Sequence, residues 1–120
     1  METCGKMRVY LAGPMRGIEK FNFPAFFEAA VRLRADNHEV FNPAEADLKK
    51  YGPGVFDSDT GDLKDVKDSG FILREALAKD TNWICLHAEA IALLPGWEKS
   101  KGACAEKALA EALGLKIIYL

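Results

Sequence analysis

Short apolar runs alternate along the chain with longer segments of helical periodicity, and this alternation restricts the possible folds more than any other feature of the sequence. Four runs have the length and composition of buried strands: RVYLA, EVFNP, EAIALLP and LKIIYL, which begin at Arg8, Glu39, Glu89 and Leu115. Strands that alternate with helices form mainly parallel sheets, because each right-handed crossover returns the chain to the end of the sheet where the previous strand began.

Helical signals fill the intervals between these runs. The first helix is expected within residues 22–36, where Asn22 can act as a cap, a proline suits the first turn and apolar side chains recur with helical spacing. Two more helices are expected at residues 71–88 and 103–114, the last ending on Gly114. The predicted fold class is therefore α/β: a three-layer, Rossmann- or flavodoxin-like, mainly parallel sheet of four to five strands with helices on both faces.

The pattern weakens in the middle of the chain. A short helix could form over residues 44–52, but residues 52–70 are rich in Asp, Gly and Ser and show no sustained period. We expect a long loop there, either a lid over a functional site or a surface excursion. A chain of 120 residues has room for one core, so residues 1–120 are expected to form a single domain, with residues 1–6 as a loose N-terminal arm.

Charge and hydropathy exclude several kinds of partner. The formal net charge is −2 and no basic stretch is interleaved with aromatic residues, so no polymeric nucleic acid is expected as a partner. The apolar runs are much shorter than the roughly 20 residues of a membrane span, and no signal peptide is recognisable, so we expect no membrane partner and a cytoplasmic location. The three cysteines lack C-x-x-C spacing, which favours neither a disulfide framework nor a zinc site.

Ligands of open α/β sheets bind beyond the carboxyl ends of the strands, so the loops that leave those ends are the places for chemistry. Three loops qualify: AGPMRG, the region after FNP, and PGWEKSKG. In the first, Gly13 and Pro14 allow a tight exit, and Arg16 is either a rigid fork for a carboxylate or phosphate or a plain surface arginine. The loop matches neither a dinucleotide-binding fingerprint nor a P-loop.

The third loop carries signals for an anion. It contains Trp97, and Ser100 stands at the predicted helix start between two lysines, with Gly102 two residues on. Unpaired N–H groups and the helix dipole attract anions to such a start, although Ser100 also suits a simple helix cap. Glu106 follows in the second turn with small residues one turn before it, and it is either a cavity-facing acid or a solvated one.

Asp80 is a further candidate, because it interrupts a helix that otherwise packs on the sheet. If this helix points its end at the strand termini, Asp80 can face Glu106 across one cleft. Two carboxyl groups in one cleft are the minimum requirement for cleaving a glycosidic bond, one as nucleophile and one as acid or base.

Three blocks of the sequence carry a resemblance to known proteins: VYLAGPMRG, NFPAFFEAAVRLRADNHEVFNPAE and ALLPGWEKSKGACAEKALAEALG. They resemble a family of small, often phage-encoded proteins of unknown function (DUF4406-like) that is related to the nucleoside 2-deoxyribosyltransferases. More distantly, they are similar to the nucleoside 5′-monophosphate N-glycosidases. The resemblance to the small family covers nearly the whole chain, whereas that to the enzymes is confined to short motifs.

The resemblance to these enzymes implies roles for individual residues. Tyr10 occupies the place of a strand-end tyrosine beside the catalytic glutamate. Ser100, Gly102 and Glu106 match an S-x-G-x-x-x-E motif in which the serine holds phosphate and the glutamate attacks C1′. Asp80 matches the aspartate of a D-x-x-W helix, which contacts the base or sugar and serves proton transfer.

The match is incomplete in the phosphate-binding loop. The monophosphate glycosidases have a serine, an apolar residue and an arginine there, and this chain has Pro14, Met15 and Arg16. Pro14 in place of the serine weakens the implication of a monophosphate substrate. The relatives build their sites at subunit contacts, so the resemblance also implies a homo-oligomer. Four nearby aromatic side chains are expected in the core rather than in a dimer contact: Phe21, Phe23, Phe26 and Phe27.

The expected function is cleavage or transfer of the N-glycosidic bond of a (2′-deoxy)nucleoside or nucleoside 5′-monophosphate, without a metal or cofactor. The catalytic residues are expected to be Glu106 as nucleophile, Asp80 as acid and Tyr10 as orienting group. The residues expected to bind substrate are Gly13, Pro14, Arg16, Trp97, Ser100 and Gly102. Two alternatives stay open: a non-catalytic module that binds and sequesters a small nucleotide, and a structural or host-interaction protein with a vestigial pocket.

Overall fold

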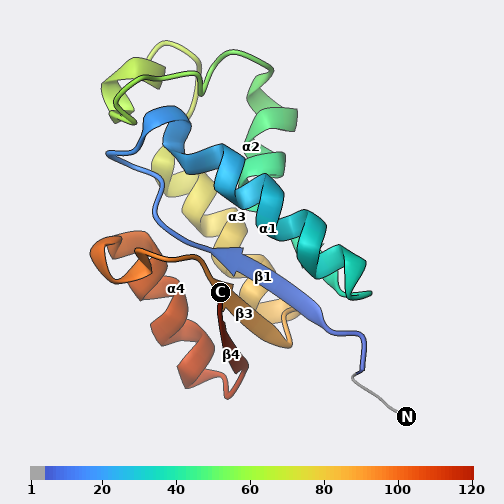
Figure 1. Ribbon diagram of the computed structural model, residues 1–120. Helices are drawn as coiled ribbons and strands as arrows, with labels where there is room; N and C mark the ends of the chain where they lie inside the picture. Colours follow the sequence, from blue (N-terminus) through green and yellow to red (C-terminus); the bar gives the residue numbers. More distant parts are fainter. Residues whose placement is uncertain (1–4) are drawn as a thin grey trace.

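The four strand-like runs form one sheet in the computed structural model, which describes residues 5–120 (Figure 1). The strands are β1 (Arg8–Ala12), β2 (Glu39–Phe41), β3 (Ala90–Leu93) and β4 (Lys116–Tyr119). Their order in the sheet is β2-β1-β3-β4, and all pairings are parallel. The predicted mainly parallel sheet is confirmed, with four strands. A loose arm is predicted over residues 1–6, and residues 1–4 of it lie outside the described residues.

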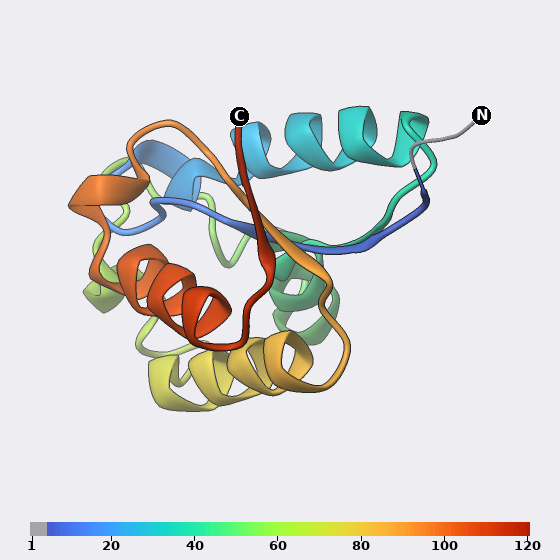
Figure 2. The same ribbon diagram turned by 90° about the horizontal axis from the view of Figure 1, so that it is seen from below.

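Helices cover both faces of this sheet, as predicted. They are α1 (Phe23–Ala35), α2 (Pro43–Tyr51), α3 (Leu73–Leu86) and α4 (Lys101–Ala112). Figure 2 shows α1 along one face and α3 with α4 along the other, which gives three layers. The short α2 follows β2 and packs against α1. Gly114 lies just beyond α4 with a φ of 72°, in the left-handed conformation that the sequence predicts for a helix end.

Each face of the sheet has its own hydrophobic cluster. Along β1, Val9 and Leu11 belong to the cluster on the α1 side, and Tyr10 and Ala12 to the cluster on the side of α3 and α4. Burial on both faces is typical of parallel strands. The aromatic side chains around the start of α1 lie in the core, as expected: Phe21, Phe23 and Phe26 are buried, and Phe27 packs against the same cluster. The side chain of Tyr10 therefore points toward α3 and α4.

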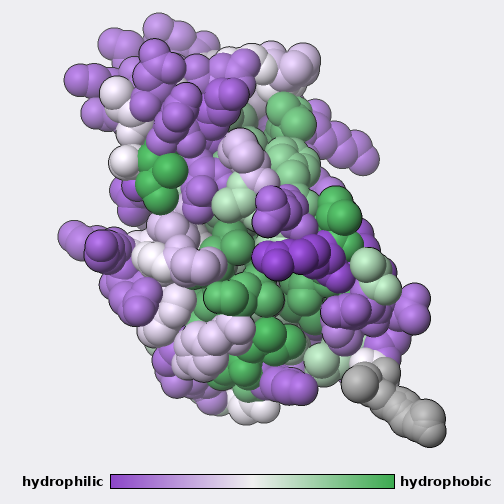
Figure 3. Space-filling model, in the orientation of Figure 1, coloured by the Kyte–Doolittle hydropathy of each residue, from purple (hydrophilic) through white to green (hydrophobic). Residues whose placement is uncertain are grey.

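Helix α1 lies on the face of the sheet that is turned toward the viewer in Figure 3. Hydrophobic side chains gather below α1 on this face, whereas hydrophilic ones surround the 52–70 loop at its upper end. Ile118 of β4 packs against the cluster on the α1 side but stays partly exposed, and Val31 on α1 is exposed. Within residues 5–120, none of the helices has both the length and the apolar composition needed to cross a membrane.

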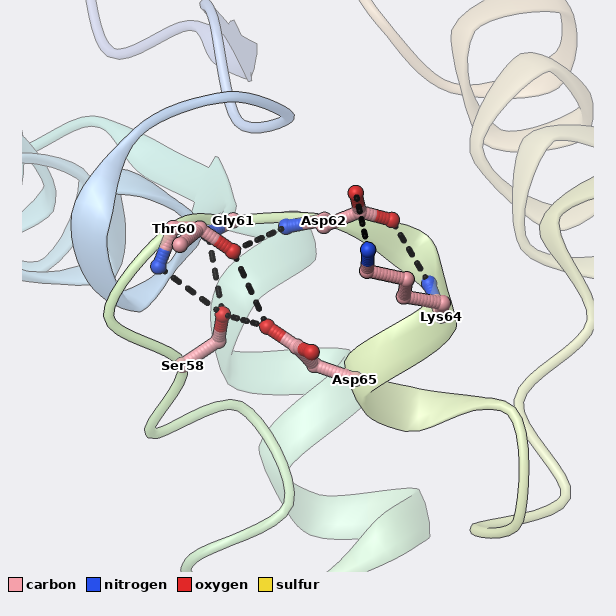
Figure 4. A network of polar contacts seen from close by, with 6 residues as sticks. All are labelled: Ser58, Thr60, Gly61, Asp62, Lys64 and Asp65. Atoms are coloured by element: carbon pink, nitrogen blue, oxygen red, sulfur yellow. Dashed lines mark hydrogen bonds and ion pairs between the residues drawn. The ribbon is translucent and has the colours of Figure 1, made fainter.

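The 52–70 segment is a loop, as predicted, and polar contacts hold it together. The hydroxyl groups of Ser58 and Thr60 both donate to Asp65 Oδ2, at 2.5 and 3.0 Å. Figure 4 shows both contacts as dashed lines. These hydrogen bonds favour the ionised carboxylate and lower the pKa of Asp65. The loop therefore has a defined shape, built around the short 3₁₀ turn Leu63–Val66.

The same loop is fastened to the segment that follows β1. The N–H group of Lys20 donates to the carbonyl oxygen of Ser58 at 2.6 Å. A second bond runs from the N–H group of Gly17 to the carbonyl oxygen of Gly61, at 2.9 Å. Phe56 of the loop is buried in the cluster on the α1 side. The loop is thus part of the packed structure.

Gly13 ends β1 where Leu94, just beyond β3, passes close to it. A Cβ atom at position 13 would lie 2.7 Å from the Cβ of Leu94 and 2.9 Å from its Cδ1, well inside normal contact distance. The sequence predicts that Gly13 makes room for a ligand. In the structure, the absence of a side chain there is required by the packing of Leu94.

We expect Gly13→Ala to lower the free energy of unfolding by about 1–3 kcal/mol, because the added methyl group overpacks the junction with Leu94. Urea unfolding measures the change. Gly102→Ala is the matched control, since a Cβ there meets only Ser100 Oγ at 3.9 Å. Alanine inside a helix should stabilise by about 0.5–1 kcal/mol. Equal effects of the two substitutions would contradict this explanation of Gly13.

Candidate active site

A cavity of about 250 Å³ lies beyond the carboxyl end of β1, toward the 52–70 loop in Figure 1. Residues from α2, α3, α4, the 52–70 loop and the segment after β1 line it. It brings together most of the residues that the sequence singles out: Tyr10, Gly13, Arg16, Asp80, Ser100, Gly102 and Glu106. The remaining walls are largely apolar, and they include five aromatic rings: Phe21, Phe23, Phe26, Phe56 and Phe71.

Tyr10 and Glu106 form the buried polar contact of this cavity. The Tyr10 hydroxyl donates to Glu106 Oε2 at 2.7 Å. Tyr10 is held in the middle of β1, and Glu106 lies in the second turn of α4 and is only 6% exposed. The alternative that Glu106 is a solvated surface acid is therefore wrong. A short hydrogen bond from a rigid strand fixes the direction in which this carboxyl group points.

Burial raises the pKa values of the acids in the cavity. The pKa of Glu106 rises to about 8 because its charged form is poorly solvated; the charge of Asp80 adds to the rise and the hydroxyl of Tyr10 opposes it. The pKa of Asp80 rises to about 6 through burial, against the hydroxyl of Tyr10 and the charge of Lys79. Burial and the two acids hold the pKa of Tyr10 well above 10.0, so Tyr10 stays a neutral donor. The pair of acids thus shares one proton near neutral pH.

These shifts predict how stability depends on pH. The pKa of Glu106 is 4.5 in a solvated chain and about 8 here, so between these values the folded protein binds a proton that the unfolded chain releases. The stabilisation from this proton is complete below about pH 4.5 and is lost as the pH rises to about 8. We expect Glu106 to cause a loss of about 5 kcal/mol across this range, because each unit of pKa difference corresponds to about 1.36 kcal/mol. Urea unfolding of Glu106→Gln against wild type measures it: the stability difference should grow with pH in favour of the variant, and parallel curves would contradict the shift.

The start of α4 forms a polar end of the cavity. Ser100 is the N-cap, as the plainer interpretation predicts, and its Oγ accepts a hydrogen bond from the N–H of Ala103 at 3.1 Å. The hydroxyl proton of Ser100 is still available as a donor. The exposed cationic side chains of Arg16 and Lys101 also line the cavity. Capping the helix and binding an anion are therefore compatible roles for Ser100.

Gly102 leaves the polar end of the cavity open. A substitution at this position should therefore weaken anion binding without lowering the stability of the fold. The helix has room for a methyl group at Gly102, so neither backbone nor packing requires a glycine. We expect Gly102→Ala to weaken binding of inorganic phosphate or a nucleotide by about tenfold, because the methyl group fills space over the N–H groups of the helix start. Calorimetric titration measures it, beside the stability gain expected above. Unchanged affinity would show that the anion does not bind at this helix.

Two of the predicted binding residues lie outside the cavity lining. Pro14 is buried, and its carbonyl oxygen accepts a hydrogen bond from Asn22 Nδ2 at 3.0 Å. The ring of Trp97 packs near Tyr119, with centroids 6.0 Å apart, and Lys107 Nζ lies 5.2 Å from its centre. Neither residue is among those that line the cavity.

Asp47 is a cavity residue that the sequence reasoning missed. It lies on α2, one turn after Pro43, and both residues line the cavity. Burial and the charge of Asp80 raise the pKa of Asp47 to about 7. A signal was present in the sequence, because α2 follows the FNP strand end, one of the three loops expected to carry chemistry. Without a sustained helical pattern, the direction of the Asp47 side chain could not be inferred.

A protein-family model matches nearly the whole chain. The model described as "Domain of unknown function (DUF4406)" matches residues 7–119. Neither the curated proteins nor the solved structures with which the chain was compared include a match. The match spans all four strands, all four helices and every residue placed in the cavity. The protein therefore belongs to the DUF4406 family, whose function is unknown.

Proposed function

We propose that this protein cleaves or transfers the N-glycosidic bond of a (2′-deoxy)nucleoside or nucleoside 5′-monophosphate, with Glu106 as nucleophile. The observation that carries the proposal is the 2.7 Å hydrogen bond from the Tyr10 hydroxyl to the buried Glu106 carboxyl group. Asp80 lines the same cavity, which supplies the second carboxyl group that the reaction needs. The resemblance to nucleoside 2-deoxyribosyltransferases supports the substrate class.

In the first step, a Glu106 carboxylate oxygen attacks C1′ and the bond from C1′ to the base nitrogen breaks, through an oxocarbenium-like transition state. Asp80 gives its proton to the departing nitrogen. The attacking form carries the charge on Glu106 and the proton on Asp80, and the hydrogen bond from the Tyr10 hydroxyl stabilises the charge on Glu106. The product is a glycosyl ester of Glu106 and a free base.

In the second step, a water molecule or the nitrogen of a second base attacks C1′ of the ester. The bond from C1′ to Glu106 breaks, and Asp80, now ionised, takes the proton of the attacking group. Water completes a hydrolysis and a base completes a transfer. At the polar end of the cavity, Ser100, Arg16 and Lys101 would bind the 5′ end of the substrate.

The test is a chromatographic assay of free base released from deoxyribonucleosides, ribonucleosides and their 5′-monophosphates, each with and without an acceptor base. Release of base, or exchange with the acceptor, is the expected result and identifies the substrate. The assay should run from pH 5 to 9, because the pair of acids changes protonation in this range. No release at any pH would overturn the proposal.

One observation favours the alternative of a nucleotide-binding module without catalysis. With a pKa of about 8, Glu106 is mostly protonated at neutral pH in the free protein, a form that donates a hydrogen bond but does not attack. Tight nucleotide binding by calorimetry together with no turnover, even above pH 8, would establish that function. We further propose a cytoplasmic homo-oligomer, which light scattering of the purified protein would test.

A further inference from the structure

Asp47 is a partly buried acid with no partner in the described part of the chain. Between residues 5 and 120, no hydrogen bond or ion pair involves its carboxyl group, whereas each of the buried or half-buried carboxyl groups of Glu106 and Glu45 has one. A partly buried polar group without a partner destabilises the fold. Asp47 also lines the cavity, so a bound ligand could supply the missing donor.

A rigid helix holds Asp47 in place. Asn42 caps α2: its side chain accepts from the N–H of Ala44 at 3.0 Å and is itself buried. Arg34 donates to both carboxylate oxygens of Glu45, at 2.6 and 2.7 Å, which ties the first turn of α2 to α1. A recognition group on a doubly anchored helix is better positioned than one on a loop.

The acids of the cavity come one each from α2, α3 and α4. The charge of Asp80 raises the pKa of both Asp47 and Glu106, so Asp80 is within electrostatic reach of both. In the proposed reaction, Glu106 faces C1′ and Asp80 faces the departing nitrogen. Asp47 lines the same cavity from α2 and is the remaining acid available to the base.

The cavity lining around Asp47 offers few hydrogen-bond donors, because Lys50 and Lys79, whose charges act on Asp47, do not line the cavity. Phe56, Phe71 and Leu77 are apolar, and the Tyr10 hydroxyl is already bonded to Glu106. Each carboxyl group keeps at least one acceptor oxygen in either protonation state. A base edge with an exocyclic amino group supplies a hydrogen-bond donor to Asp47. An edge with carbonyl groups on both sides of one N–H instead places the lone pairs of the carbonyl oxygens against the carboxyl group.

We propose that Asp47 recognises the base and selects nucleosides or nucleotides whose base carries an exocyclic amino group over those whose base carries a carbonyl group in its place. This inference rests on the proposed function for the position of the base. It adds a specificity-determining residue that neither the sequence motifs nor the resemblance identifies.

Binding measured in a variant that cannot turn over tests the proposal separately from catalysis. In the Glu106→Gln background, calorimetry compares dCMP with dUMP, which differ in the amino or carbonyl group at C4 and in N3, an acceptor in cytosine and an N–H donor in uracil. We expect dCMP to bind at least tenfold more tightly, because a site with buried acceptors rejects a ligand that leaves them unpaired. Asp47→Asn should bring the ratio near one, since the amide offers both an acceptor and a donor.

Two further variants keep the result interpretable. Asp36→Asn, an exposed acid just beyond α1, is the matched control and should keep the tenfold ratio. Asp47→Ala is used if the asparagine variant unfolds. It should weaken the binding of dCMP without strengthening the binding of dUMP. Equal affinities in the background variant, a ratio that survives both changes at Asp47, or no binding of either nucleotide would overturn the inference. Base release by the wild-type protein in the panel assay would still support the glycosidic function.

Discussion

Replacing Glu106 by glutamine should reduce base release or exchange by about 10³-fold or more, because the amide cannot form the glycosyl ester. The substitution changes little else. A glutamine carbonyl oxygen can accept the hydrogen bond of Tyr10 in place of Oε2. At neutral and alkaline pH the variant should be more stable than wild type, since no charge has to be buried at position 106. Steady-state rates by chromatography, on substrate identified in the panel assay, measure the loss.

Glu111→Gln is the matched control for this experiment. Glu111 lies on the same helix, and its carboxylate pairs with Lys107 Nζ at 3.0 Å on the exposed side of α4. An exposed pair of this kind contributes little to stability, so wild-type rates and a wild-type unfolding curve are expected. Wild-type activity in Glu106→Gln would exclude Glu106 as nucleophile, whereas equal losses in both variants would point to a general effect on α4.

Tyr10→Phe should lower kcat/KM by about 10- to 100-fold, which corresponds to a hydrogen bond to a charged group of about 1.5–3 kcal/mol. The hydroxyl of Tyr10 lowers the pKa of both Glu106 and Asp80, against the effect of burial. Without it both pKa values rise further. The bell-shaped dependence of kcat/KM on pH, with limbs expected near the values of about 6 and about 8, should therefore move to higher pH.

The shift in pH dependence distinguishes two explanations of a lower rate. Either Tyr10 orients the nucleophile through its hydroxyl, or the substitution only disturbs the packing of the core. Phenylalanine fills nearly the same volume, so the contacts with Phe41, whose ring lies 5.6 Å from that of Tyr10, should persist. Phe41→Leu serves as a control: it disturbs the packing of the Tyr10 ring but leaves its hydroxyl in place. A rate loss without a shift in the profile, in both variants alike, would show that Tyr10 acts only through packing.

The fold was predictable because its signals are local. Strand length, the alternation of strands with helices, and the breaks at Gly-Pro and Asn-Pro identify the parallel sheet with no knowledge of distant contacts. The left-handed residue after α4 was predictable for the same reason, since Gly114 tolerates that conformation at no steric cost. Prediction was weakest in residues 44–70, where the signals are mixed. The direction of the Asp47 side chain could not be predicted there, and the same segment contains the loop that lines part of the cavity.

The sequence did not reveal why a glycine is present at a particular position. Gly13 and Gly102 look alike in the sequence, as small residues near a predicted ligand. The structure separates them, because Leu94 occupies the space beside Gly13 and nothing but Ser100 approaches Gly102. Pro14 and Trp97 illustrate the same limit: both belong to loops that contribute residues to the cavity, but neither lines it.

The sequence by itself determined which residues can do chemistry and at which end of the sheet they lie, because strand ends and helix starts follow from local propensity and capping. Only the tertiary structure decided their environment. The burial of Glu106, its bond to Tyr10 across 96 positions of the chain and the third acid on α2 depend on how helices pack on the sheet. Desolvation, which sets the pKa values of these acids, is a property of that packing and of no local stretch of sequence.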